Sequence, residues 1–280
     1  MSSWTPHSWT AQRVLDAAAA MEFVPEGAIE VRTDDYRLVR HPDWALGHTV
    51  GAAQVTWSRT TRPLDEVIDE VAAHVRGWGL PGVAWWVSAV SRPAGTEEAL
   101  RARGAGLIDA MQVLARELGG DPGQPAIPGG ISVELVRDER TFRAASAVSV
   151  QGWGSVEPDE AEIARQLKEA LEDLASWSSF RVVAFAENEP VSTGSCTLFG
   201  RPAQNRPATE KIALLWGAIT LPASRGHGSY RAILAERLRL AREHGATLVM
   251  AKGRALASGP ILLRAGFTDY GEERCYWLSI

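Results

Sequence analysis

Short continuous apolar runs alternate along this chain with apolar residues at helical spacing, which predicts a succession of strands and helices. In the first 118 residues the pattern predicts helices at 10–22, 64–78 and 97–103 and strands at 29–32, 36–39, 50–57, 83–90 and 111–118. After residue 130 it predicts strands at 131–136, 180–186, 191–199, 212–221, 247–251 and 275–280, with helices at 138–150, 160–174, from about 230, and at 256–264. Both halves end in the same order, which is strand, connection, helix, strand, short helix, strand.

The segment between these halves, Gly119–Gly130, has the composition of a linker. It reads Gly-Gly-Asp-Pro-Gly-Gln-Pro-Ala-Ile-Pro-Gly-Gly, and no hydrophobic period crosses it. Clustered glycine and proline interrupt regular structure. We therefore expect one domain at residues 1–122, a linker at 123–130 and a second domain at 131–280.

The most informative stretch runs from residue 211 to residue 231. An apolar run from Ile212 to Leu221 ends at Pro222, the short loop Arg225-Gly226-His227-Gly228 follows, and an amphipathic helix comes next. A glycine loop that enters a helix directs several backbone N–H groups at one point, where the positive end of the helix dipole adds to them. This pattern predicts a site for a pyrophosphate. Neither the G-x-G-x-x-G dinucleotide fingerprint nor the Gly-Lys-Ser/Thr of a P-loop is present.

Two short motifs of the second half resemble those of the GNAT (Gcn5-related) N-acetyltransferases. The loop resembles the family's R/Q-x-x-G-x-G/A motif, with Tyr230 where the family has a small residue. The segment Pro260-Ile261-Leu262-Leu263-Arg264-Ala265-Gly266-Phe267 resembles the family's P-x-Y-x-x-x-G-F signature. In that signature the tyrosine that often protonates the departing thiolate falls on Leu262.

The resemblance implies an α/β (α+β) fold of two tandem GNAT-like domains, each a mixed, mostly antiparallel sheet flanked by helices. The first copy resembles the degenerate half of actinobacterial tandem GNAT proteins. Its connection at residues 57–64 contains Arg59 and Arg62 but no glycine pair. The alternative is that the first half is an unrelated α/β lid. We expect one coenzyme A per chain, bound by the second half.

By resemblance, the acyl-CoA contacts fall on consecutive residues. Ala218, Ile219 and Thr220 are expected along the pantetheine arm, Gly226, His227, Gly228, Ser229, Tyr230 and Arg231 at the pyrophosphate, and Arg225 at the mouth of the loop. Glu210, before the central strand, is the candidate general base, unless it is only a solvated carboxylate. Tyr276, or alternatively Ser258, is the candidate acid in place of the missing tyrosine. Trp153, Trp177 and Trp216 belong either to an acceptor pocket or to the core.

Composition limits the possible partners. The 280 residues are 45% hydrophobic and 22% charged, with a net charge of −5 and a pI near 5.8, which suits a globular protein and does not suggest a nucleic-acid partner. No run approaches the length of a membrane span, and no signal peptide is recognisable, so a cytoplasmic protein is expected. The two cysteines and six histidines show no metal spacing. Cys196 is expected to be a buried, inert thiol. A monomer and a homodimer both remain open.

These features favour an acyl-CoA-dependent N-acyltransferase that moves an acetyl or other short acyl group to the amine of a small molecule. Transfer is expected to be direct, through a ternary complex with acetyl-CoA and without a metal. Two alternatives remain. One is different acyl-CoA chemistry on the same fold, such as O-acylation or decarboxylation of a malonyl thioester. The other is a non-catalytic coenzyme-A-binding protein, which the departures at Tyr230 and Leu262 favour.

Overall fold

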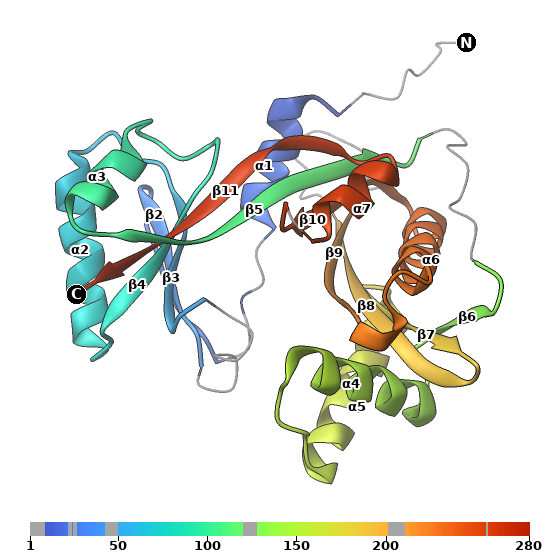
Figure 1. Ribbon diagram of the computed structural model, residues 1–280. Helices are drawn as coiled ribbons and strands as arrows, with labels where there is room; N and C mark the ends of the chain where they lie inside the picture. The colour runs from blue at the N-terminus through green and yellow to red at the C-terminus, as the bar shows by residue number, and fades with distance from the viewer. Residues whose placement is uncertain are drawn as a thin grey trace. The chain divides into compact units, whose positions relative to one another are not determined.

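The fold was analysed in a computed structural model of the chain (Figure 1). The structure describes residues 9–21, 24, 27–42, 50–119, 128–200, 211–255 and 257–280. The chain divides into two compact units. Unit 1 comprises Met1–Val113, Gly253–Gly259 and Asp269–Ile280, and unit 2 comprises Leu114–Lys252 and Pro260–Thr268. Most of the expected linker, and also Glu210, lies outside the described residues.

Unit 1 contains a mixed sheet covered by helices. Its elements are α1 (Ala11–Ala20), β1 (Ile29–Arg32), β2 (Tyr36–Arg40), β3 (Ala53–Ser58), α2 (Leu64–Gly77), β4 (Gly82–Val87), α3 (Thr96–Ala102), the first part of β5 (Gly106–Glu117) and β11 (Thr268–Ser279). The strand order is β1-β2-β3-β4-β11-β5, in which β3 and β4 are parallel and β11 is antiparallel to β4. The apolar stripe of α2, which includes Val67, Val71 and Val75, packs in a core with Tyr36 and Trp85.

The place of β11 differs from the domain division expected from the sequence. The predicted second domain extended to residue 280, whereas Asp269–Ile280 belong to unit 1. The reason is the pairing of β11 with β4, which runs in register from Arg274↔Val87 to Ser279↔Gly82. Tyr276 and Leu278 are therefore buried in the core of unit 1.

Unit 2 contains the other part of the same eleven-stranded sheet, which is also mixed. Its elements are β6 (Ile131–Leu135), α4 (Glu139–Trp153), α5 (Glu160–Ser176), β7 (Ser179–Ala186), β8 (Glu189–Gly200), β9 (Lys211–Thr220), the 3-10 turn η2 (Pro222–Ser224), α6 (Ser229–Glu243), β10 (Ala246–Gly253) and α7 (Gly259–Arg264). The C-terminal part of β5 also belongs to unit 2, where the strand order is β5-β10-β9-β8-β7-β6. Neighbours from β6 to β9 are antiparallel, and β9 and β10 are parallel.

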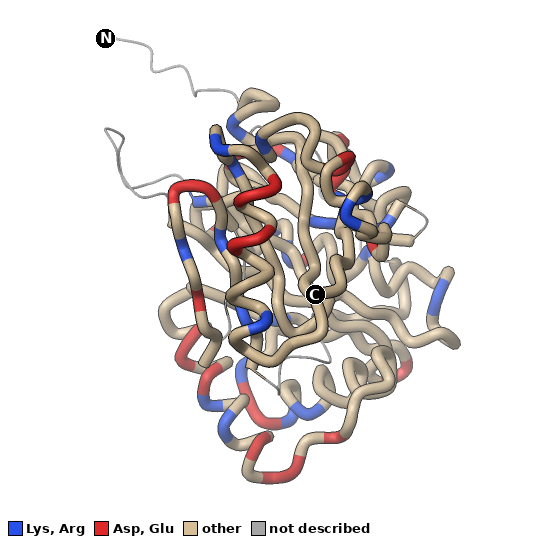
Figure 2. Tube along the Cα trace, turned by 90° about the vertical axis from the view of Figure 1, so that its left-hand side faces the viewer, with Lys and Arg blue, Asp and Glu red and all other residues tan. Residues whose placement is uncertain are grey.

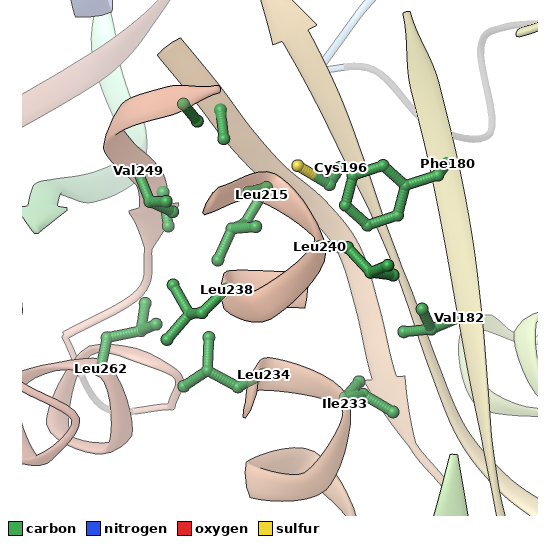
Figure 3. Close-up of a cluster of buried hydrophobic side chains, with 14 of the residues drawn as sticks. Phe180, Val182, Cys196, Leu215, Ile233, Leu234, Leu238, Leu240, Val249 and Leu262 are labelled. Atoms are coloured by element: carbon green, nitrogen blue, oxygen red, sulfur yellow. The ribbon is translucent and has the colours of Figure 1, made fainter. Parts of the chain in front are cut away.

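Each face of this sheet has its own core because side chains alternate along a strand. On β7, Val182 packs in the cluster that contains α6, whereas Val183 packs with α4 and α5. Figure 3 shows the apolar side chains of α6 meeting those of the strands in the first cluster. Leu262 lies in that cluster and is 1% exposed, so its position requires an apolar side chain. Cys196 is buried there as predicted.

The α4 helix begins where the sequence predicts, and a local signal explains why. Asp138 is its N-cap, and the Asp138 carboxylate accepts from the backbone N–H of Thr141 at 2.8 Å. The Thr141 hydroxyl in turn accepts from the Asp138 N–H, which completes a capping box. The start of this helix is therefore encoded by two residues, independently of the rest of the fold.

Candidate active site

The loop between β9 and α6 has the backbone that the glycine pattern predicts. Gly226 and Gly228 have φ of 82° and 92°, in the left-handed region that favours glycine. Gly228 is the N-cap of α6 and supplies no side-chain cap. The first hydrogen bond of α6 joins the Ala232 N–H to the Gly228 carbonyl at 3.0 Å. The three preceding N–H groups, at residues 229–231, therefore have no partner within the helix.

The electrostatics around this helix start favour an anion. No acidic residue lies in the first turn of α6, while Arg225, His227 and Arg231 are exposed around it. Arg225 also donates from Nε to the Thr220 carbonyl at 3.2 Å, which ties the loop to the end of β9. Exposed cations and free N–H groups at a helix start together attract a diphosphate.

The loop is not equally open to a ligand at Gly226, Gly228 and Ser229. An ideal Cβ on Gly226 would meet no atom within 4 Å, so the backbone is open to a ligand there. A Cβ on Gly228 would come within 2.5 Å of Pro128 Cγ, so a proline packs closely against this residue. Ser229 is 1% exposed, and its hydroxyl has no partner among the described residues. The open backbone at Gly226 fits an approaching phosphate group, whereas protein atoms cover Gly228 and the Ser229 hydroxyl.

Next to this loop, β9 carries a bulge. In the pairing with β8, Thr193 lies opposite Ile219 and Ser195 lies opposite Trp216, so β9 has one residue more than β8 over this interval. Gly217, within the interval, has a φ of 61°. A bulge of this kind increases the local twist and leaves its extra residue out of the ladder.

Beyond the bulge, β9 separates from β10. The parallel pairing of the two strands ends at Leu215↔Ala251. Ala218, Ile219 and Thr220 therefore form an edge of β9 that does not pair with β10. Such an edge offers backbone N–H and C=O groups to an extended ligand. It leads directly into the glycine loop, so the contacts expected for pantetheine and for pyrophosphate are continuous.

Two arginines flank β8 beside the bulge, Arg237 fully buried and Arg181 partly buried, and sequence reasoning missed both. On the α6 face, Arg237 is fully buried, and its Nη1 donates to the Ser195 carbonyl at 3.2 Å. Burial lowers its pKa, while the nearby Tyr230 hydroxyl acts in the opposite direction. On the α4 face, burial lowers the pKa of Arg181 to about 10. Neither forms an ion pair with a carboxylate among the described residues. The sequence did hold a signal for both residues, because each arginine stands at a position where the helical or strand periodicity expects an apolar side chain.

The expected site residues fall into two groups. Ala218–Thr220 and Arg225–Arg231 all lie in unit 2, on β9, the loop and the first turn of α6. Tyr276 lies in unit 1, and its hydroxyl donates to Glu97 at 2.8 Å and accepts from Arg101 Nη2 at 2.6 Å. Burial and Glu97 raise the pKa of Tyr276. The phenol is therefore engaged in a local network of its own unit, and Ser258 also belongs to unit 1.

Tyr230 and the three tryptophans named from the sequence differ in their surroundings. Tyr230 packs at the edge of the α6 core and faces Arg237. Trp153 and Trp216 are 52% and 50% exposed, and Trp216 Nε1 donates to the Thr197 hydroxyl at 2.9 Å. Trp177 instead stacks on His244, with ring centroids 3.3 Å apart. Two of the three tryptophans are thus available to a ligand.

Within the described ranges, no group of three or more histidine, cysteine, aspartate and glutamate side chains is arranged to hold a metal ion. The described helices also include none that is both long enough and apolar enough to span a membrane.

Unit 1 has no equivalent of the glycine loop at the start of α2. The residue before α2 is Pro63, and the first turn carries Asp65 and Glu66. Figure 2 shows the acidic residues of α2 in the first half of the helix. Arg62, which precedes it, pairs with Asp35 and Glu70 at 3.0 and 2.9 Å. Carboxylates therefore occupy the helix start and engage this cation, which disfavours a phosphate there.

Comparisons with known proteins identify the fold. No protein-family model and no curated protein sequence matches the chain. Among solved structures, it is similar to a GCN5-related N-acetyltransferase from Kribbella flavida, with 16% identity, coverage of 95% of this chain and 94% of that one, and a TM-score of 0.65. It is also similar to a tandem GNAT protein from the clavulanic acid biosynthesis pathway, with 17% identity, coverage of 97% and 89%, and a TM-score of 0.58.

A third similar structure, a functionally unknown conserved protein from Staphylococcus epidermidis, has 12% identity, coverage of 94% of this chain and 100% of that one, and a TM-score of 0.60. The chain therefore has the fold of the GCN5-related N-acetyltransferases, in its tandem form. The fold class predicted from the sequence is confirmed.

Proposed function

We propose that the chain is an acyl-CoA-dependent N-acyltransferase that transfers an acetyl or other short acyl group to the amine of a small molecule. The observation that carries this proposal is the continuity of three features in unit 2. The unpaired edge of β9, the bulge at Gly217 and the left-handed glycine loop follow one another along the chain. Together they offer the backbone groups and positive charge that an acyl-pantetheine ending in a diphosphate would contact.

In this proposal, the diphosphate is bound by N–H groups from Gly226 to Arg231, with Arg225 and Arg231 as exposed cations. The edge formed by Ala218, Ile219 and Thr220 pairs with the amides of the pantetheine arm. The residue that the bulge leaves out of the ladder would offer its N–H to polarise the thioester carbonyl and to stabilise the oxyanion that develops there. Most of the rate then comes from positioning the amine against this carbonyl.

Direct transfer is supported by the state of the cysteines. A route through an acyl-enzyme requires a nucleophile, and a thiol acts as one only when it is ionised. Burial raises the pKa of Cys196 to about 12, and that of Cys275 to about 12. Both thiols are therefore protonated at neutral pH. Glu210 remains our candidate for the base that accepts the ammonium proton.

The cofactor site is tested by Gly226→Ala, with Gly245→Ala as the matched control. Both glycines have positive φ, 82° and 89°, and both have open space around the added Cβ, so the backbone strain is similar. Only Gly226 lies in the proposed pyrophosphate loop. We expect acetyl-CoA affinity to fall at least about tenfold, or about 1.4 kcal/mol, in Gly226→Ala alone. Calorimetry that gives the same affinity for both variants would reject the site.

The type of reaction is tested by measuring thiol release from acetyl-, propionyl- and malonyl-CoA, with and without a panel of amines. Release that requires an amine supports N-acyl transfer. Loss of CO₂ from malonyl-CoA without an amine supports the decarboxylase alternative. Binding of acyl-CoA without release under any condition supports the non-catalytic alternative.

A further inference from the structure

Arg181 is held deep against α4 but keeps one edge of its guanidinium open. Its Nε donates to the Thr193 hydroxyl at 3.1 Å, and its Nη2 donates to the Ala145 carbonyl at 2.8 Å and to the Ser149 hydroxyl at 2.5 Å. Nη1 has no hydrogen-bond partner among the described residues and is not one of the fully buried polar atoms. The free edge of this cation is therefore accessible to solvent.

The register of unit 2 places Arg181 in line with the bulge. Arg181 lies opposite Ser195 in the β7–β8 pair, and Ser195 lies opposite Trp216 in the β8–β9 pair. Residues directly opposite one another in antiparallel strands have side chains on the same face of the sheet. Arg181, Ser195 and Trp216 thus form a row across three strands, on the face that carries α4.

The same row ends at the bulge of β9. An ideal Cβ on Gly217 would lie 4.0 Å from Ser195 Oγ, so the serine hydroxyl is next to the bulge. This hydroxyl also has no partner in the described part of the chain and is not among the fully buried polar atoms. The helix α4 approaches the same segment closely, since a Cβ on Gly152 would come within 2.4 Å of Ile219 Cγ1.

Arg181 differs from a nearby helix arginine in its charge partners. Arg143 of α4 forms ion pairs with Glu139 and Glu160. Arg181 has no such carboxylate in the described ranges, and the Arg237 charge on the opposite face of β8 is also unpaired. A partly buried guanidinium that lacks a counter-charge favours an anion at its open edge, because a charge-assisted hydrogen bond is stronger than one to a neutral group.

We propose that the acceptor is an amine that also carries an anionic group, a carboxylate or a phosphate, and that Arg181 binds this group. The inference rests on the proposed function, in which the amine attacks at the bulge. Neighbouring strands are about 4.8 Å apart. Since the Arg181 side chain extends over β8 to Thr193, its free edge is within reach of the anionic end of a short amino acid or aminoalkyl phosphate. The exposed Trp216 ring provides an apolar wall beside them.

The test compares acceptors that differ only in charge. Glycine, β-alanine and γ-aminobutyrate are assayed against their amides, and phosphoethanolamine against ethanolamine, with acetyl-CoA. The variants are Arg181→Gln, Arg181→Lys, which keeps the charge, and Arg143→Gln, which removes a charge from the exposed side of α4. Acetyl-CoA affinity is measured by calorimetry for each variant, and folding is checked by thermal unfolding.

We expect at least one anionic acceptor to have a KM at least about tenfold below that of its uncharged partner. Arg181→Gln raises that KM about tenfold or more and leaves the KM of the uncharged partner within about twofold, since only the anion is bound by the guanidinium. Arg181→Lys gives an intermediate KM, and Arg143→Gln gives the wild-type value. The carboxylate and phosphate arms show which anion is preferred. A purely structural role of Arg181 would change both acceptors of a pair equally.

Two results overturn the inference. One is equal KM for charged and uncharged partners in the wild-type chain, and the other is a preference for the anion that survives in Arg181→Gln. If acetyl-CoA binds but no amine is acylated, the proposed function fails separately. The anionic probes are then titrated against the coenzyme A complex. Binding that is lost in Arg181→Gln supports the anion site, and binding that is absent or unchanged rejects it.

Discussion

The guanidinium of Arg237 occupies the space that a side chain on Gly194 would fill. An ideal Cβ at Gly194 would lie 2.9 Å from both Cζ and Nη1 of Arg237. Arg237 Nη1 donates to the carbonyl of Ser195, the next residue of β8, where the register with β9 shifts. The buried cation, the glycine and the bulge are therefore one local arrangement.

We predict that Gly194→Ala destabilises the chain by about 1–3 kcal/mol, as overpacking a rigid core does. The added methyl group must displace a guanidinium that is fully buried and held by α6. Denaturant unfolding measures the change. Gly200→Ala, on the same strand with nothing within 4 Å of its Cβ, is the control and should change stability by less than about 0.5 kcal/mol. Equal stability of the two variants would show that the arginine moves aside freely.

We predict that one coenzyme A binds per chain. The start of α6 offers free N–H groups and no carboxylate, whereas the start of α2 carries Asp65 and Glu66. A diphosphate at α2 would meet like charge instead of a complementary dipole. Equilibrium titration with acetyl-CoA should give a stoichiometry near one. A second tight equivalent that persists in Gly226→Ala would mean that unit 1 binds its own cofactor.

We predict that Tyr276→Phe lowers stability and leaves turnover unchanged. The Tyr276 hydroxyl exchanges hydrogen bonds with Glu97 and Arg101 inside unit 1, so its loss should reduce the free energy of unfolding by about 1 kcal/mol. Thermal unfolding and kcat for acyl transfer measure the two effects. A fall in kcat of a hundredfold or more, with the fold intact, would instead identify Tyr276 as the general acid.

We predict that stability falls as the pH rises above about 9. Burial raises the pKa of Cys196 and Cys275 from 9.0 to about 12 in the folded chain. Between these values the unfolded chain has lost protons that the folded chain retains, so each thiol lowers the free energy of unfolding by up to about 1.4 kcal/mol per pH unit. Urea unfolding between pH 8 and 11 measures the slope.

Cys196→Ala is the control for that slope, because it removes one of the two titrating thiols. Its loss of stability with rising pH should be shallower than that of the unchanged chain. The native thiols should also resist alkylation at pH 8 and react after unfolding. Rapid alkylation of the folded chain would contradict the burial of both groups.

The sequence by itself determined the features that rest on local signals. The glycines at 226 and 228 required left-handed backbone before a helix, and both have it. The apolar stripe of α6 predicted which face of that helix packs on the sheet, and Asp138 predicted where α4 begins. In each case, the conformation depends on residues within one or two turns of the chain.

Only the tertiary structure decided which strands pair and which charges remain unpaired. The final strand has a periodicity that suits either unit, and its backbone pairing with β4 places it in unit 1. The extra residue of β9 is defined only by its register with β8. Arg143 has carboxylate partners in Glu139 and Glu160, whereas Arg181 has none in the part of the chain that the structure describes. Pairing and register depend on contacts between residues far apart in the chain, and a local pattern does not carry that information.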